Sequence, residues 1–212
     1  MALALSPDHG LRFVAKPLLF VACLVPLGLL VLGGLQGDLG ANPLERVTHV
    51  TGDWGLRLLL ITLAITPLRR LSGWTRLLRL RRMLGLFAFF YVSLHFLTWV
   101  WLDQELVWSA IVADIAKRPY VTVGFSAWLL LVPLAATSTR GIMRRLGRNW
   151  QRLHRLVYGA AVLGVLHYIW LVKADLLQPL IYAAMLAILL AVRWRPHWLD
   201  RLGGGGAPIN AR

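Results

Sequence analysis

Residues 83–102 read MLGLFAFFYVSLHFLTWVWL and contain no Asp, Glu, Lys or Arg over twenty consecutive positions. A bilayer core about 30 Å thick needs about 20 apolar residues in each helix that crosses it. Four more stretches are free of the same four residue types, namely 17–35, 119–138, 156–172 and 176–192. The sequence therefore predicts an integral membrane protein made of α-helices.

A sixth span is predicted even though its uncharged part, LLLITLAITPL (58–68), is short. A helix of bilayer length at this position also includes Asp53 and Arg57. The Arg57 side chain can extend to the interface. Residues 106–116 are apolar but too short to span, so we expect an interfacial helix there, and residues 203–212 are expected to form a flexible, glycine-rich tail. The fold prediction is one domain over 1–212, an all-α bundle of six transmembrane helices at about 17–35, 52–68, 83–102, 119–138, 154–172 and 176–193.

The charged residues are distributed unevenly between the predicted loops. A net charge of +14 suggests nucleic-acid binding in a soluble protein. Here 18 of the 23 Lys and Arg residues fall on one side if the N-terminus is cytoplasmic, and seven of the nine acids fall on the other. Excess Lys and Arg in short inner loops sets the orientation of a membrane protein. We therefore expect both termini in the cytoplasm, contact with membrane lipid, and no nucleic-acid partner.

Several common functional signatures are missing from the sequence. The single cysteine, Cys23, excludes a disulfide within the chain and a cysteine-based metal site, and is expected to be a small packing residue. No Rossmann glycine motif or Walker loop is present, so a dedicated nucleotide domain for flavin or nicotinamide chemistry is not expected. No internal repeat is evident.

Two histidines fall at matching depth in the predicted spans. His95 follows Arg82, the last charge before its span, by 13 residues, and His167 follows Arg155 by 12. These spacings correspond to about 20 Å and about 18 Å along a helix. The two helices are predicted to run in parallel, so their imidazoles could hold one haem iron between them. The alternative is a hydrogen bond from each histidine to a neighbouring helix.

His154 lies about 20 Å along the helix from His167, at the inner interface. On an ideal helix the two side chains point about 140° apart, so sharing a face would need a bulge or bend. Gly159 and Gly164 between them would permit such a distortion, or could serve only close helix packing. For His154, haem ligation and an interfacial or phosphate contact are both open.

Other candidate residues near the histidines have simpler interpretations. Tyr91 and Trp99 flank His95 by four residues on either side and could wall a haem pocket, although ordinary bundle packing explains them as well. His49 is expected at the outer interface, and His9 and His197 are expected at the surface.

Four segments together resemble one known family. They are HVTGDWGLRLLLITLAITPLRR (49–70), RRMLGLFAFFYVSLHF (81–96), KRPYVTVG (117–124) and RLGRNWQRLHRLVYGAAVLGVLHYIW (145–170). In order and content they resemble the MsrQ (YedZ) family, which comprises the haem-binding membrane subunits of the bacterial periplasmic methionine sulfoxide reductase system. That family is part of the ferric-reductase-like transmembrane family, and the resemblance covers roughly residues 40–195.

The resemblance implies a multi-pass protein of the bacterial inner (plasma) membrane that binds haem b, one or two per chain, with FMN also attributed to the family. It implies electron transfer from a cytoplasmic flavin reductase or the quinone pool to MsrP, a periplasmic molybdopterin enzyme. The sulfoxide chemistry, which repairs oxidised periplasmic proteins, is expected on that partner. The haem histidines of the family fall on His95, His154 and His167.

The sequence departs from the wider family at one position. The related NADPH oxidases carry two histidines fourteen residues apart on the third helix, and the residue fourteen before His95 is Arg81. A haem at His154 therefore lacks an evident second ligand, and Arg81 or Arg82 becomes a candidate contact for a haem propionate. No residue can be assigned to FMN.

Two other functions fit parts of the sequence. One is a ferric reductase or a quinol-linked b-type cytochrome that acts without MsrP. The other is a small transporter, which would be expected to show helices broken at mid-membrane and two similar halves. Pro26, Pro67 and Pro133 could break helices, but the missing repeat disfavours this class.

Overall fold

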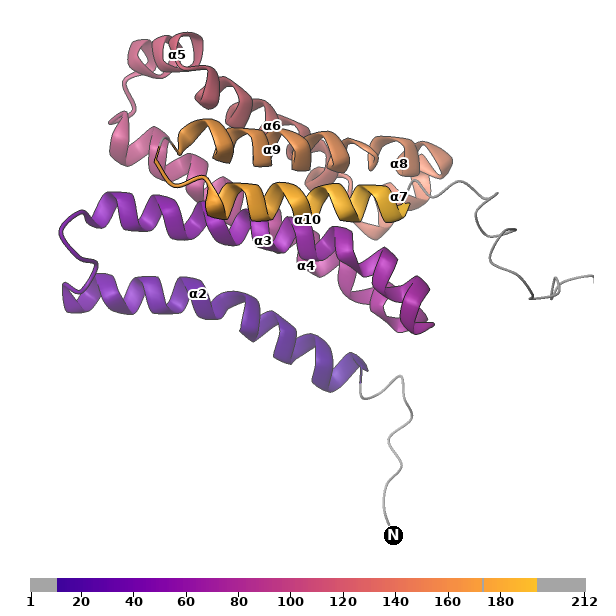
Figure 1. Cartoon of the computed structure of the whole chain (residues 1–212). Helices are drawn as coiled ribbons and strands as arrows, with labels where there is room; N and C mark the ends of the chain where they lie inside the picture. Colours follow the sequence, from indigo (N-terminus) through magenta and orange to yellow (C-terminus); the bar gives the residue numbers. More distant parts are fainter. Residues whose placement is uncertain (1–10, 173, 194–212) are drawn as a thin grey trace, which may run out of the picture.

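The computed structural model describes residues 11–172 and 174–193, and within these ranges it contains helices and turns but no strand (Figure 1). The predicted tail at 203–212 lies outside the described residues. Short turns of other helical type occupy Leu11–Ala15, Thr75–Leu77 and Trp99–Asp103. The α-helices are α2 (Lys16–Gln36), α3 (Pro43–Ser72), α4 (Leu78–Thr98), α5 (Trp108–Lys117), α6 (Pro119–Ala136), α7 (Arg140–Leu146), α8 (Arg148–Leu153), α9 (Leu156–Leu171) and α10 (Leu177–Arg193).

The exterior of the described structure is apolar. Leu18, Leu29 and Ile188 each expose more than 60% of their surface, and exposed apolar surface on this scale is suited to lipid rather than water. Three helical stretches are long and apolar enough to cross a membrane, namely Phe13–Gln36, Thr75–Asp103 and Pro119–Ala136. The prediction of an all-α protein with membrane-spanning helices is confirmed in this form, whereas the six-helix bundle and the cytoplasmic termini stay predictions.

Helix α3 is longer than predicted, because residues 43–51 are helical and not part of a loop. The Asn42 side chain accepts a hydrogen bond from the Glu45 amide at 3.3 Å, and Pro43 occupies the first turn. A side-chain cap, a proline in the first turn and an acid near the N-terminus all stabilise a helix start. At the other end Gly73 adopts φ 71°, the left-handed conformation that ends many helices.

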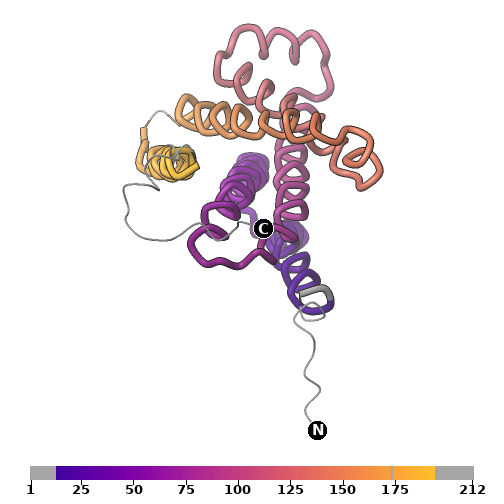
Figure 2. Tube along the Cα trace, turned by 90° about the vertical axis from the view of Figure 1, so that its right-hand side faces the viewer, coloured from indigo at the N-terminus to yellow at the C-terminus, as the bar shows by residue number. Residues whose placement is uncertain are grey.

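Two antiparallel helix pairs form the centre of the structure, α3 with α4 and α6 with α9 (Figure 2). Glycines allow the close approach within each pair. A Cβ added at Gly55 would lie 2.6 Å from the Val92 side chain, and one added at Gly159 would lie 3.3 Å from Leu130. Helix α4 contacts α6 and α3 contacts α9, while α10 packs on α3 and α9, and α2 on α3 and α4.

The two pairs are copies of one pattern, 72 residues apart along the chain. The expectation of no internal repeat is therefore corrected. Few positions are identical and the inner turns differ in structure, so the repeat becomes visible only when the helices are paired in space. The matching first-copy residues are Gly52, Leu58, Leu59, Ala64, Leu84, Ala88, Leu94 and His95, which recur as Gly124, Leu130, Leu131, Ala136, Leu156, Ala160, Leu166 and His167.

Tyr91 fastens α2 to the bundle instead of walling a pocket beside His95. Its side chain is fully buried. The hydroxyl donates to the Cys23 carbonyl at 2.7 Å and accepts from the Leu27 amide at 3.2 Å. These two backbone groups would pair with each other in a regular helix, and Pro26 between them perturbs α2 at this point.

Replacing Tyr91 with phenylalanine should loosen this attachment. Tyr91→Phe removes both hydrogen bonds without changing the ring, so we expect the free energy of unfolding to fall by about 1 kcal/mol. Thermal unfolding of the detergent-solubilised protein, followed by circular dichroism, measures the change. Tyr120→Phe is the matched control, because its hydroxyl makes only an exposed contact with Arg118. Equal unfolding temperatures for the two variants would contradict this role.

Candidate functional site

His95 of α4 and His167 of α9 come together between the two helix pairs. Their ring centres are 6.0 Å apart and the ring planes are inclined by 75°. The depth count along the two spans predicted this meeting, and the geometry confirms it. Both rings are half-buried.

Each imidazole is held by the other helix of its own pair in the same way. His95 Nδ1 lies 2.9 Å from the Thr48 carbonyl oxygen, and His167 Nδ1 lies 2.7 Å from that of Tyr120. Each contact joins residues 47 apart in the sequence. Donation from Nδ1 to a carbonyl leaves Nε2 as the coordinating nitrogen, the usual arrangement behind a metal-bound histidine.

Two glycines make these short contacts feasible. Gly52 and Gly124 each lie one helical turn after the carbonyl that accepts the imidazole hydrogen bond. A Cβ added at Gly52 would lie 3.0 Å from His95 Nδ1, and one added at Gly124 would lie 2.6 Å from His167 Nδ1. Neither glycine is predicted as a site residue from the sequence. The only signal for them is a glycine at the same offset from each histidine.

A layer of aromatic rings fixes α4 against α6 beside the histidines. Phe96 stacks on Trp128 with ring centres 4.4 Å apart, and Trp128 Nε1 donates to Ser93 Oγ at 3.1 Å. The ring centres of Trp99 and Phe96 lie 5.9 Å apart. This layer joins α4 of the first copy to α6 of the second copy next to the two imidazoles.

His154 does not join the pair. It lies at a break between α8 and α9, so the helix predicted over residues 154–172 begins only at Leu156. Its ring stacks on Trp150 with centres 3.8 Å apart, and its Nδ1 lies 3.1 Å from the Trp150 carbonyl. The Trp150 indole in turn donates to the Thr137 carbonyl at 3.1 Å.

The two arginines predicted as propionate contacts differ in environment. Arg82 is exposed, whereas Arg81 is half-buried and close enough to His154 for their charges to interact. In the repeat Arg82 occupies the position that corresponds to His154. The first copy therefore offers an arginine where the second offers a histidine.

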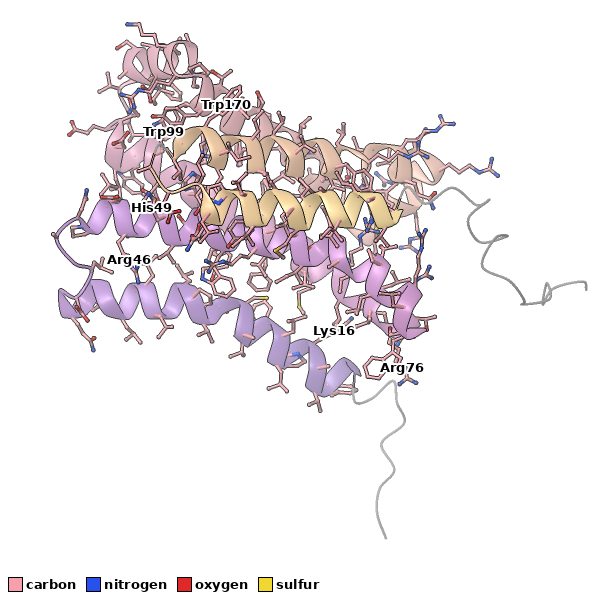
Figure 3. The ribbon with its side chains drawn as sticks, in the orientation of Figure 1. Lys16, Arg46, His49, Arg76, Trp99 and Trp170 are labelled. Atoms are coloured by element: carbon pink, nitrogen blue, oxygen red, sulfur yellow. The ribbon has the colours of Figure 1, made fainter. Side chains whose placement is uncertain are left out.

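Among the described residues, His49 is also not part of the pair. His49 is exposed on α3 and lies toward the end of the bundle that also holds Trp99 (Figure 3). Lys16 and Arg76 mark the opposite end (Figure 3). We call these the outer and inner ends, after the predicted orientation. His9 and His197 lie outside the described residues.

Arg57 is paired within the bundle and does not simply extend to the interface as predicted. Its guanidinium lies 3.1 Å from the Asp53 carboxylate, and its Nε donates to the Tyr182 hydroxyl at 2.8 Å. It also lies 5.3 Å from the centre of the Trp54 ring. The ion pair explains how a charged residue fits within a mostly apolar helix.

The histidine pair fits a haem better than a bare metal ion. Two imidazoles on opposite sides of one metal, each about 2 Å from it, place their ring centres about 6 Å apart. Among the described residues no group of three or more His, Cys, Asp or Glu side chains could enclose a metal ion. Two neutral nitrogens from facing helices suit an iron whose other ligands come from a porphyrin.

Fold and site together define a helical membrane protein with a histidine pair set between two repeated helix hairpins. Residues 51–165 match the family model described as ferric reductase like transmembrane component. Three curated relatives are each named protein-methionine-sulfoxide reductase heme-binding subunit MsrQ. The Rhodospirillum rubrum protein is 60% identical over 190 residues, covering 89% of this chain and 91% of that protein.

The Herminiimonas arsenicoxydans protein is 55% identical over 189 residues (88% of this chain, 87% of that protein). The Xanthomonas campestris pv. campestris protein is 56% identical over 187 residues, 85% of each chain. No solved structure matches. The chain belongs to the ferric-reductase-like transmembrane family and, within it, to the MsrQ proteins.

Filling the space of Gly124 should disrupt the histidine pair. In Gly124→Ala the new Cβ would overlap His167 Nδ1, so the imidazole must move away from the Tyr120 carbonyl. Loss of such a supporting contact lowers metal affinity roughly tenfold or more, so we expect the variant to retain far less haem on purification. Gly28→Ala is the control, since nothing lies within 4 Å of an added Cβ there. Equal haem retention by both variants would contradict the role given to Gly124.

Proposed function

We propose that this chain is the haem-binding membrane subunit that carries electrons within an MsrQ-type methionine sulfoxide reductase system. The observation that carries the proposal is the pair His95 and His167, with ring centres 6.0 Å apart and each Nδ1 directed at a backbone carbonyl. The names of relatives that are 55–60% identical over most of the chain support it.

In this proposal His95 and His167 bind the iron of a haem b through Nε2, and the Thr48 and Tyr120 carbonyls hold the two rings in place. Bound haem supplies a one-electron carrier. With two protein nitrogens bound to it, such an iron would have no free position for a substrate. The site is therefore suited to electron transfer, and the sulfoxide chemistry belongs to a partner.

The proposed topology is six spans in the bacterial inner membrane with both termini in the cytoplasm. All seven acids among the described residues lie toward the outer end. Basic residues collect at the inner end. This asymmetry supports electron entry at the inner end, from a cytoplasmic flavin reductase or the quinone pool. Electrons would leave at the outer end to MsrP, the periplasmic molybdopterin subunit.

His154 is proposed as a ligand for a second, inner haem, and the number of haems per chain is part of the proposal. Its repeat counterpart is Arg82, which cannot bind iron. FMN is carried over from the family without assigned residues. Removing His154 should lower haem content without removing the His95–His167 site.

The histidine pair is tested by the absorbance of the purified full-length protein. The reduced-minus-oxidised spectrum should show a b-type haem band that is lost or strongly shifted in His95→Ala and in His167→Ala, because either change removes an axial ligand. His49→Ala should keep the band, since His49 is exposed on α3. A band unchanged in both ligand variants would refute the assignment.

The electron acceptor is tested by mixing the reduced protein with an MsrP-type partner and methionine sulfoxide. With the partner in catalytic amount, we expect the haem band to return to its oxidised form only when partner and sulfoxide are both present, and His167→Ala to abolish the reaction. Reoxidation by a ferric chelate but not by the partner would favour the ferric-reductase alternative. The transporter alternative has less support, although a repeat exists, because both proposed ligands lie within unbroken stretches of α4 and α9.

A further inference from the structure

At the inner end, arginines from different helices gather, and none of the acids among the described residues is paired with them. Arg193, the last residue of α10, donates from Nη2 to the Leu63 carbonyl of α3 at 3.0 Å and from Nη1 to the Tyr158 hydroxyl of α9. Its guanidinium also lies 5.2 Å from the centre of the Tyr158 ring. Three helices therefore meet at one cation.

The Leu63 carbonyl is available because of Pro67. A regular helix would pair it with the amide of the residue four positions later, and proline has no amide hydrogen. Arg193 replaces that missing donor. The guanidinium is thus fixed by backbone and phenol oxygens, and its positive charge is not neutralised by either.

A second arginine approaches the same place from α4. The antiparallel packing of α3 on α4 sets Gly52 against His95 and Thr62 against Gly85. Continued by one turn, the same register places Arg81 opposite Thr66. Arg81 is near enough to Arg193 and Tyr158 for charge interactions with both. Arg81, Arg193, Tyr158 and Thr66 are together called the inner arginine cluster.

Buried polar atoms in this region lack partners. Thr66 Oγ1 and Arg193 Nε are buried without a hydrogen bond, and so is Nε of Arg69, one turn further along α3. The acids of the described residues all lie toward the opposite end. Buried donors are nearly always satisfied, and buried like charges require a counter-charge. A group that accepts hydrogen bonds and carries negative charge would satisfy these atoms.

We propose that the inner arginine cluster binds an oxyanion, and that this is the phosphate of an anionic phospholipid. Basic pockets between membrane helices bind such headgroups, and arginine pairs well with phosphate. A haem propionate near His154 is the other source of the same chemistry. The cluster is separate from the His95–His167 site, because Tyr158 lies nine residues, about 13 Å along α9, from His167.

The experiment compares the unfolding temperature of the full-length protein in mixed micelles containing phosphatidylglycerol or phosphatidylcholine. We expect phosphatidylglycerol to raise it by several degrees in the wild type, because a bound ligand stabilises the folded state. Arg81→Gln should lose this increase. Arg82→Gln, an exposed neighbour with the same loss of charge, should keep it and so controls for general attraction to anionic lipid.

Haem content separates the two sources of the oxyanion. Loss of the phosphatidylglycerol effect in Arg81→Gln with unchanged haem per protein identifies a phospholipid. Loss of haem in Arg81→Gln, matched by His154→Ala but not by Arg82→Gln, identifies a propionate and overturns the phospholipid assignment. If Arg81→Gln behaves as Arg82→Gln does in both measurements, the oxyanion site itself is refuted. Arg81→Gln is preferred to Arg193→Gln because Arg193 also satisfies the Leu63 carbonyl.

Discussion

The contact of an imidazole with a helix backbone at a glycine is the constraint on which the site depends. A histidine ring can reach a main-chain carbonyl of the neighbouring helix only where no Cβ intervenes. His167 meets this condition against Gly124, and His95 meets it against Gly52. Each contact orients one ring and at the same time fixes how closely its two helices approach. The positions of the metal ligands and the packing of the pairs are therefore set by the same atoms.

The repeat applies this constraint twice, once in each helix pair. Two hairpins built on one pattern face each other, so one kind of half-site used twice yields two opposed ligands at equal depth. The symmetry ends at the inner end, where Arg82 and His154 occupy corresponding positions. The histidine half-sites near the outer end are thus matched between the copies, whereas Arg82 and His154 near the inner end differ in charge and in ligand chemistry.

Much of this arrangement could be predicted from the sequence. The uncharged stretches of the sequence predict the apolar helices. The number of residues from Arg82 to His95 and from Arg155 to His167 predicts that these two histidines lie at the same depth. The start of α3 is also visible in the sequence, because Asn42, Pro43 and Glu45 are ordinary residues of a helix N-terminus. Apolar stretches alone do not show it, since this first part of the helix is polar. The supporting glycines and the repeat could not be found by such counting, because both depend on which helices pair. Burial of Arg81 rather than Arg82 likewise depends on the register of α3 with α4.

Pro67 has a consequence for the order in which the protein is assembled. The carbonyl of Leu63 has no donor within α3, and its partner, Arg193, is the last residue of α10. A backbone group left unpaired within the membrane costs several kcal/mol. Since α10 is synthesised more than a hundred residues after α3, this end of the bundle stays incomplete until the final helix arrives. A chain that ends before α10 would therefore keep an unpaired Leu63 carbonyl at the inner end of α3.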